Sequence, residues 1–216
     1  DYMSSTTEQI RQAQRSLRKQ LNFIDFEDNL VRETCMAQCD LNGYGEISFY
    51  EATEIKDIEL HFNIAITSFD EMKQFKNLTT IYANTFNNCN KLTSVVLPES
   101  VERIYYYAFR NCSQLQKVNL SEYLIELGTE AFGGCTSLKE VSIACPTPEN
   151  IHLGNNVFRN ANLSECTLRV PCGAKEHYEN ADVWKEFGTI VYQGTLSIVE
   201  ASDGGTMTIN FSTPYV

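Results

Sequence analysis

The sequence has little that would mark it as a nucleic-acid-binding or membrane-spanning chain. Its 17 Lys and Arg residues are outnumbered by 28 Asp and Glu residues, which gives the 216-residue chain a formal net charge of -11. A chain this acidic repels phosphate backbones, so we expect no nucleic acid partner. No apolar run approaches the roughly 20 residues that a membrane-spanning helix needs, so we expect no transmembrane segment.

Signatures of catalysis are also missing. The sequence contains no G-x-S-x-G, no H-E-x-x-H and no glycine-rich phosphate-binding loop. Its three histidines, His61, His152 and His177, fall in unrelated segments, and no C-x-x-C pair marks a zinc site. We therefore predict that the chain is not an enzyme.

The strongest pattern that the sequence does contain is an internal repeat. Phe86, Phe109 and Phe132 are spaced by 23 residues. The same spacing relates three further sets of residues, which are Cys89, Cys112 and Cys135; Leu92, Leu115 and Leu138; and Val95, Val118 and Val141. A period near 23 falls within the range of about 20–29 residues that is typical of leucine-rich repeats. The pattern predicts a solenoid, in which the V-x-L step is a short strand and stacked coils share one core.

This repeat resembles a known family. The stretch A-F-R-N-C-S-Q-L at 108–115, followed by x-x-V-x-L, looks like the BspA-like, or Treponema pallidum-type, leucine-rich repeat. The stretch 166–190, with its V-P-C-G turn and its W-x-x-F pair, is similar to the closing segment of such arrays. The resemblance covers roughly 66–191, and it departs from the pattern at Ser121, in place of proline, and in the insert 144–156. It implies a secreted or surface-attached bacterial protein, of the kind found in Bacteroides and its relatives, with a role in adhesion.

The region before the repeats is predicted to be helical and to carry a loop that resembles a calcium site. Helical spacing of apolar residues predicts helices over 7–21 and 28–38. The next segment, D-L-N-G-Y-G-E-I-S-F-Y-E at 40–51, matches the twelve-residue calcium loop of an EF-hand at most positions. Its candidate metal ligands are Asp40, Asn42, Tyr44, Glu46 through its carbonyl, Ser48 and Glu51.

Two interpretations of this loop stay open. Tyr44 stands where Asp or Asn normally supplies a ligand, so the loop is either a weakened calcium site or a loop of the same shape without metal. The sequence indicates no other cofactor. The segment Ile66–Glu71 also resembles the I-T-S-F-x-E stretch that follows such a loop in some BspA-like proteins, which favours a cap that covers the first coil.

The cysteines divide by their position in the repeat. Cys89, Cys112 and Cys135 share one register position, so we expect a ladder of buried thiols rather than disulfides. The three cysteines of the irregular last coil, at 145, 166 and 172, leave a disulfide among them open.

Alternation along the repeat strands predicts which side chains face a partner. Two outward rows and a run of three tyrosines supply the candidate binding residues, which are Ser94, Val96, Lys117, Asn119, Glu140, Ser142, Arg169, Tyr105 and Tyr106. Their mixed chemistry suits a protein or glycan ligand on host or neighbouring cells.

The sequence as a whole predicts an α+β chain in three parts. We expect a helical cap over 1–65, a leucine-rich repeat solenoid over 66–194, and a β-hairpin, or the start of a further domain, over 195–216. The predicted function is non-enzymatic binding or adhesion, in a protein that is secreted or held on the bacterial outer surface. The alternative is a structural spacer that presents another domain.

Overall fold

The computed structural model describes residues 2–62, 64–193, 195–199 and 208–212. Three α-helices come first, which are α1 (Tyr2–Gln20), α2 (Asn29–Cys39) and α3 (Phe49–Glu54). Most of α1 projects from the body, so that Ile10 and Leu17 are 55% and 54% exposed. Helix α2 begins where the sequence places it, because the Asp28 carboxylate accepts a hydrogen bond from the Leu30 N–H and so caps its first turn.

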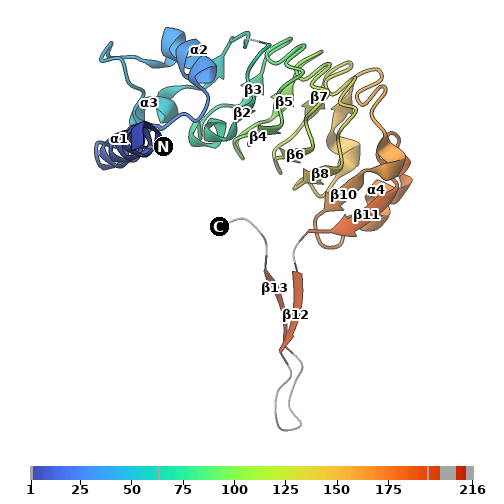
Figure 1. Cartoon of the computed structure of the whole chain (residues 1–216). Helices are drawn as coiled ribbons and strands as arrows, with labels where there is room; N and C mark the ends of the chain where they lie inside the picture. Colours follow the sequence, from blue (N-terminus) through green and yellow to red (C-terminus); the bar gives the residue numbers. More distant parts are fainter. Residues whose placement is uncertain (1, 63, 194, 200–207, 213–216) are drawn as a thin grey trace.

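The repeats that follow form a succession of short coils, which runs from left to right in Figure 1 and whose strands pair in parallel. A five-stranded parallel sheet runs in the order β1 (Asp57–Ile58), β3 (Thr80–Ile81), β5 (Arg103–Ile104), β7 (Glu126–Leu127) and β9 (His152–Leu153). A second parallel sheet runs in the order β11 (Thr189–Tyr192), β10 (Thr167–Val170), β8 (Glu140–Ile143) and β6 (Lys117–Leu120). Strand β2 (Ser68–Phe69) pairs in parallel with β4 (Ser94–Val95), which lies beside β6. Each repeat contributes one strand to each side of the coil, and each strand pairs with its counterpart in the next repeat.

Short 3₁₀ helices complete the coils and the closing segment. They are η1 (Asp70–Gln74), η2 (Pro148–Asn150), η3 (Leu163–Glu165) and η4 (Trp184–Glu186), and one further α-helix, α4 (Lys175–Asn180), lies near the end of the array. Large side chains of the closing segment pack onto the array. The Tyr178 hydroxyl donates to the Cys145 carbonyl at 2.8 Å, and the Trp184 ring lies 6.1 Å from that of Phe187. These contacts cover the last coil.

The A-F-x-N-C stretch turns sharply because two residues of each coil adopt a left-handed backbone. These residues precede and follow the phenylalanine by two positions, and they are Asn84 and Asn88, Tyr107 and Asn111, Glu130 and Gly134, and Asn156 and Asn160. Asn and Gly tolerate this conformation better than other residues, which explains the asparagine after the phenylalanine in three of the four coils.

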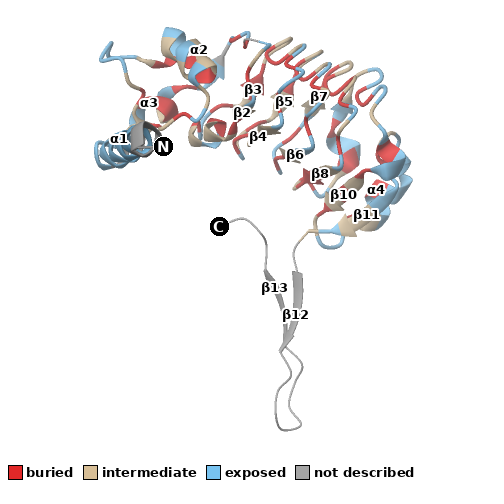
Figure 2. Ribbon diagram, viewed as in Figure 1, coloured by how far each residue is buried: buried red, intermediate tan, exposed pale blue. Residues whose placement is uncertain are grey.

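The phenylalanines of successive coils form a stack through the core. The ring centroids of Phe86 and Phe109 lie 4.8 Å apart, those of Phe109 and Phe132 lie 5.1 Å apart, and those of Phe132 and Phe158 lie 5.5 Å apart. The stack continues into the region predicted as the cap, because Phe62 lies 4.8 Å from Phe86. The buried residues form one continuous core along the array (Figure 2).

The cysteines of the repeat register lie next to this stack. The Cys112 thiol donates to the Phe86 carbonyl and the Cys135 thiol to the Phe109 carbonyl, both at 3.2 Å. Burial raises the pKa of the Cys89 and Cys135 thiols to about 12. The prediction of a buried thiol ladder agrees with these contacts.

The structure also bears on the cysteines of the last coil. All eight cysteines, each of which lies in the described part of the chain, are thiols rather than disulfides. Cys145 and Cys166 are buried, whereas Cys172 is exposed. The disulfide left open by the sequence is therefore absent among these described residues.

Ser121, where the repeat departs from its proline, is accommodated by a hydrogen bond. Its side chain is buried, and its hydroxyl donates to the carbonyl of Val101 in the preceding coil. Proline has no hydroxyl, so at this position it would leave the Val101 carbonyl without this donor. The serine thus adds a hydrogen bond between two neighbouring coils.

The helical region and the repeats are joined by reciprocal hydrogen bonds. The Asp28 carboxylate accepts from the Thr67 N–H at 2.8 Å and from its hydroxyl at 3.0 Å, while the Glu71 carboxylate accepts from the Glu27 N–H at 3.0 Å. Ile66 and Phe69 of the same stretch are fully buried. Strand β1 already pairs with β3, so the first coil begins before the boundary at residue 65 that the sequence suggested.

Beyond the array, β12 (Thr195–Val199) pairs antiparallel with β13 (Thr208–Ser212). The D-G-G turn that the sequence places between these strands lies outside the described residues.

Candidate functional site

The candidate binding surface is the outward side of strands β6, β8 and β10, with β4 beside them. Parallel register places Lys117, Glu140 and Thr167 in one row, and Asn119, Ser142 and Arg169 in the next. The residues between these rows point inward, and Val118, Val141 and Leu168 are at most 1% exposed. We call the outward side chains of β6, β8 and β10 the strand face. It lies along the lower side of the array in Figure 1.

Ion pairs connect the two rows of the strand face. Glu140 lies between two cations, with its carboxylate 2.8 Å from the Arg169 guanidinium and 3.5 Å from the Lys117 ammonium. Partial burial raises the pKa of Glu140, but the hydrogen bond and charge of Arg169, together with Lys117, outweigh it and lower the pKa overall. Glu140 therefore stays ionised at neutral pH. Its ion pairs hold the side chains of Lys117 and Arg169 in place on the strand face.

Ser142 corrects the sequence-based list of candidate contacts. Strand alternation places it outward, yet only 5% of its surface is exposed. Its neighbours in register, Asn119 and Arg169, carry longer side chains that flank it on both sides. Ser142 is therefore covered by its row and is not available to touch a partner.

Ser94 of β4 and Val96, which directly follows β4, continue the two rows, and both are half-buried. The Ser94 hydroxyl donates to the Asp70 carboxylate of η1, so this side chain is engaged within the chain. The exposed and half-exposed side chains of the strand face are therefore concentrated on β6, β8 and β10.

The tyrosines do not join the strand face. Tyr105 directly follows β5, which belongs to the five-stranded sheet, and its ring packs edge-on against Tyr82 at 5.9 Å. Tyr106 is 53% exposed, and the Arg110 guanidinium lies 4.8 Å from the centre of the Tyr107 ring. The structure thus divides the predicted contacts between two sides of the coil.

Sequence reasoning missed two exposed apolar side chains in the turn after β6. Tyr123 is 58% exposed and Ile125 is 39% exposed. Two features of the sequence could have indicated them. They fall in the segment where Ser121 replaces the proline of the repeat, and they alternate with Leu124, which occupies a buried position of the repeat.

The loop 40–51 runs from the end of α2 into the first turn of α3, and hydrogen bonds from its own backbone to its side chains hold it. The Asp40 carboxylate accepts from the Gly43 N–H and the Gly45 N–H, both at 2.9 Å. The Asn42 amide oxygen accepts from the Tyr44 N–H at 2.9 Å. Gly43 and Gly45 have positive φ angles of 74° and 81°, which the tight turn requires.

The donor set of this loop does not fit calcium well. The Tyr44 side chain is 82% exposed, so it extends into solvent and takes no ligand position, which corrects its place among the candidate ligands. The Glu46 side chain, whose residue would ligate only through its backbone carbonyl, pairs with Arg18 at 3.3 Å and Arg32 at 3.5 Å from outside the loop, which reduces the negative charge of the loop. Among the described residues, no group of three or more His, Cys, Asp or Glu side chains is arranged to hold a metal ion.

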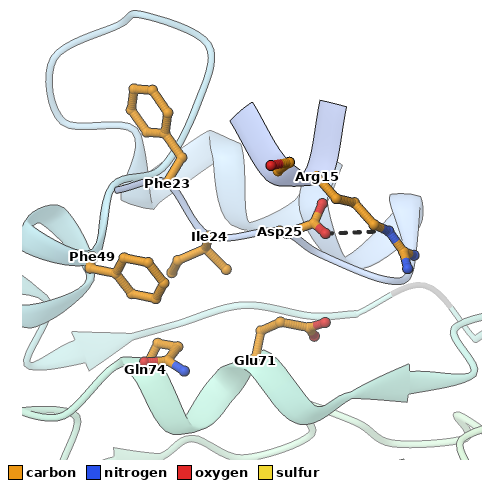
Figure 3. Close-up of a pocket in the computed structure, with 8 residues that line it drawn as sticks. Arg15, Phe23, Ile24, Asp25, Phe49, Glu71 and Gln74 are labelled. Atoms are coloured by element: carbon orange, nitrogen blue, oxygen red, sulfur yellow. Dashed lines mark ion pairs between the residues drawn. The ribbon is translucent and has the colours of Figure 1, made fainter. Parts of the chain in front are cut away.

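A cavity lies where α1 meets the body. It has a volume of about 500 Å³ and is lined by residues that include Arg15, Phe23, Ile24, Asp25, Phe49 and Glu71. Figure 3 shows Ile24 and Phe49 on one side and the carboxylates of Asp25 and Glu71 on the other, with Arg15 bonded to Asp25. The lining is mainly apolar, and its polar groups are already paired in part.

Glu71 is the unusual group in this cavity. One carboxylate oxygen accepts from the Glu27 N–H, while the other is buried without a hydrogen-bond partner among the described residues. Burial is the main cause that raises the pKa of Glu71, and the charges of Asp70 and Glu27 raise it further. The unpaired oxygen of this carboxylate can therefore accept a hydrogen bond from a further donor.

No helix within the described ranges is long and apolar enough to cross a bilayer.

Comparison with known proteins identifies the repeats. A family model described as the BspA type leucine rich repeat region matches residues 62–180 in six copies. This match covers the Phe stack, the strand face, and the two parallel sheets except β1 and β11. The sequence has no significant match among the curated proteins with which it was compared.

Proposed function

Because the chain belongs to the BspA-type leucine-rich repeat family, we propose that it is a non-enzymatic binding protein that captures a protein partner on its strand face. Repeat arrays of this kind bind through rows of exposed side chains that successive coils bring into register. The observation that carries the proposal is the ion-paired group of Lys117, Glu140 and Arg169, which three adjacent strands present across the two rows.

The chemistry of the strand face supports a protein or glycan ligand. Two cations flank one carboxylate, and Asn119 adds a neutral donor and acceptor beside them. This mixture matches the polar rim and the Arg-containing centres of protein interfaces. The ligand that fits it presents carboxylates or hydroxyls that reach Lys117 and Arg169.

The family also supports a location outside the cell. BspA-type repeats are typical of secreted and surface-attached bacterial proteins, and on this basis we propose adhesion to host or neighbouring cells as the role. The helical region before β1 acts as the cap of the array, and in it a calcium-loop-like segment joins α2 and α3. The absence of recognisable catalytic groups in the sequence is the reason that an enzyme is not proposed.

A binding screen with matched variants tests the proposal. The whole chain is presented to immobilised matrix proteins, mucins and glycans, and each hit is measured again with Lys117→Ala plus Arg169→Ala. We expect binding to weaken at least tenfold, because two charge-assisted contacts are removed. The control is Lys91→Ala plus Arg159→Ala, which removes the same charges outside the strand face. Equal binding by both double variants would show that the strand face is not the binding surface, and a screen without any hit would count against matrix proteins, mucins and glycans as ligands.

A further inference from the structure

The carboxylate of Glu51 occupies the last position of the calcium-like loop, where a bidentate metal ligand belongs. One oxygen accepts from the Leu41 N–H at 3.0 Å and the Asn42 N–H at 3.2 Å. The other accepts from the Ser48 N–H at 2.9 Å and the Ser48 hydroxyl at 2.7 Å. A carboxylate has about four lone-pair sites, and four donors of this chain already fill them.

These four hydrogen bonds connect both ends of the loop. Leu41 and Asn42 lie at its start, while Ser48 is the N-cap of α3, and Glu51 returns the cap hydrogen bond in a capping box. Glu51 is only 3% exposed. To bind calcium in bidentate fashion, it would have to give up hydrogen bonds from these four donors, and each hydrogen bond that is lost has a cost.

The neighbouring charges act in the same direction. The Arg32 guanidinium donates to the Gly45 carbonyl at 2.6 Å and pairs with Glu46, and Arg18 joins Glu46 from α1. These two cations neutralise the Glu46 carboxylate, which reduces the net negative charge of the loop and so its attraction for a cation. They also connect α1 and α2 to the loop, so its position depends on ion pairs within the chain.

We infer that the loop 40–51 is closed by the Glu51 carboxylate instead of by a metal ion, and that the cap is folded in the absence of calcium. Glu51 does the structural work that bidentate metal ligation performs in a calcium loop: it joins the first residues of the loop to the helix that follows. The loop is then a rigid connector between α2 and α3. Its backbone also pairs with the segment that follows α1, through a bridge between Phe23 and Ser48 and a hydrogen bond from the Ile24 N–H to the Ile47 carbonyl.

Thermal unfolding of the full chain in excess calcium and in excess chelator tests this inference. A ligand that binds only the folded state raises the unfolding temperature, so a calcium-dependent cap would melt higher in calcium. We expect the same unfolding temperature in both conditions. Terbium, which occupies calcium sites and is excited by nearby tyrosines, is expected to give no saturable luminescence with Tyr44 and Tyr50 in place.

Variants separate closure by Glu51 from a general effect of charge removal. Glu51→Gln loses two of the four acceptor sites, so its unfolding temperature falls by the same amount in calcium and in chelator. Glu54→Gln is the matched control, since Glu54 lies in the same helix and is exposed, and it is expected to melt as the native chain does. A rise of the native unfolding temperature in calcium, or terbium luminescence that calcium displaces and Asp40→Ala abolishes, would overturn the inference. If Glu51→Gln fails to fold, the native-chain measurements alone decide between these outcomes.

Discussion

The Phe stack is the feature whose removal should be most costly. Phe109 is fully buried between Phe86 at 4.8 Å and Phe132 at 5.1 Å. Truncation of a buried phenylalanine to alanine costs about 3–5 kcal/mol in the free energy of unfolding. Since Phe109 also loses two stacked rings, each worth about 0.5–1.5 kcal/mol, we expect Phe109→Ala to fall in the upper half of that range. This is a large part of the roughly 5–15 kcal/mol by which a domain is stable.

Urea unfolding followed by circular dichroism measures this loss. The control is Tyr106→Ala in the same coil, because this aromatic side chain is 53% exposed and its truncation should cost less than about 1 kcal/mol. A double-mutant cycle of Phe109 with Phe132 should give a coupling of about 0.5–1.5 kcal/mol. Phe62 and Phe158 lie at the two ends of the stack and do not touch each other. The unfolding free energies lost in Phe62→Ala and Phe158→Ala should therefore add in the double variant. If Phe109→Ala costs no more than Tyr106→Ala, the stack does not hold the coils together.

Two further predictions concern a close approach and a buried acid. Gly128→Ala would place a Cβ 2.4 Å from the Tyr106 backbone nitrogen in the preceding coil, so overpacking should lower the free energy of unfolding by at least about 1–3 kcal/mol. The control is Gly133→Ala, whose Cβ would meet mainly the Glu130 side chain and should cost less. Calorimetry of the two variants checks the order, and an equal loss would contradict it. Glu71→Gln should raise the unfolding temperature at pH 7, because the folded pKa of Glu71 lies above its ordinary value of 4.5 and its charged form destabilises the folded state. The gain should shrink as pH falls through the folded pKa and vanish below 4.5, where Glu71 is protonated in both states; a gain that persists at pH 4 would exclude burial of the charge as its cause.

The repeat architecture was predictable because its signal is periodic. The 23-residue spacing of Phe86, Phe109 and Phe132 fixes the inward side chains, and the structure stacks these rings as the spacing implies. Alternation along β6 and β10 likewise separates buried from outward positions. Periodicity reports on what each coil shares with its neighbours, so it predicts the core well.

The candidate site was harder to predict because it depends on what differs between coils. Ser142 occupies an outward position but is covered by longer neighbours, and alternation carries no information on the size of adjacent side chains. Tyr105 lies on the other sheet from Lys117, which follows from the shape of the coil rather than from spacing. The loop sequence showed that Glu51 was placed for a metal, but only coordinates show that four donors of the chain already surround it.

The backbone contacts between coils imply a way in which such a protein can change its reach over generations. The Phe86 N–H donates to the Ala108 carbonyl and the Phe109 N–H to the Ala131 carbonyl, so neighbouring coils meet through the same pair of atoms. A duplicated gene segment that encodes one whole coil would therefore find matching partners on both sides. Neither the cap nor the closing helix would need to change. Unequal recombination would then lengthen or shorten the strand face in steps of one strand, and the exposed surface would change in size without a new fold.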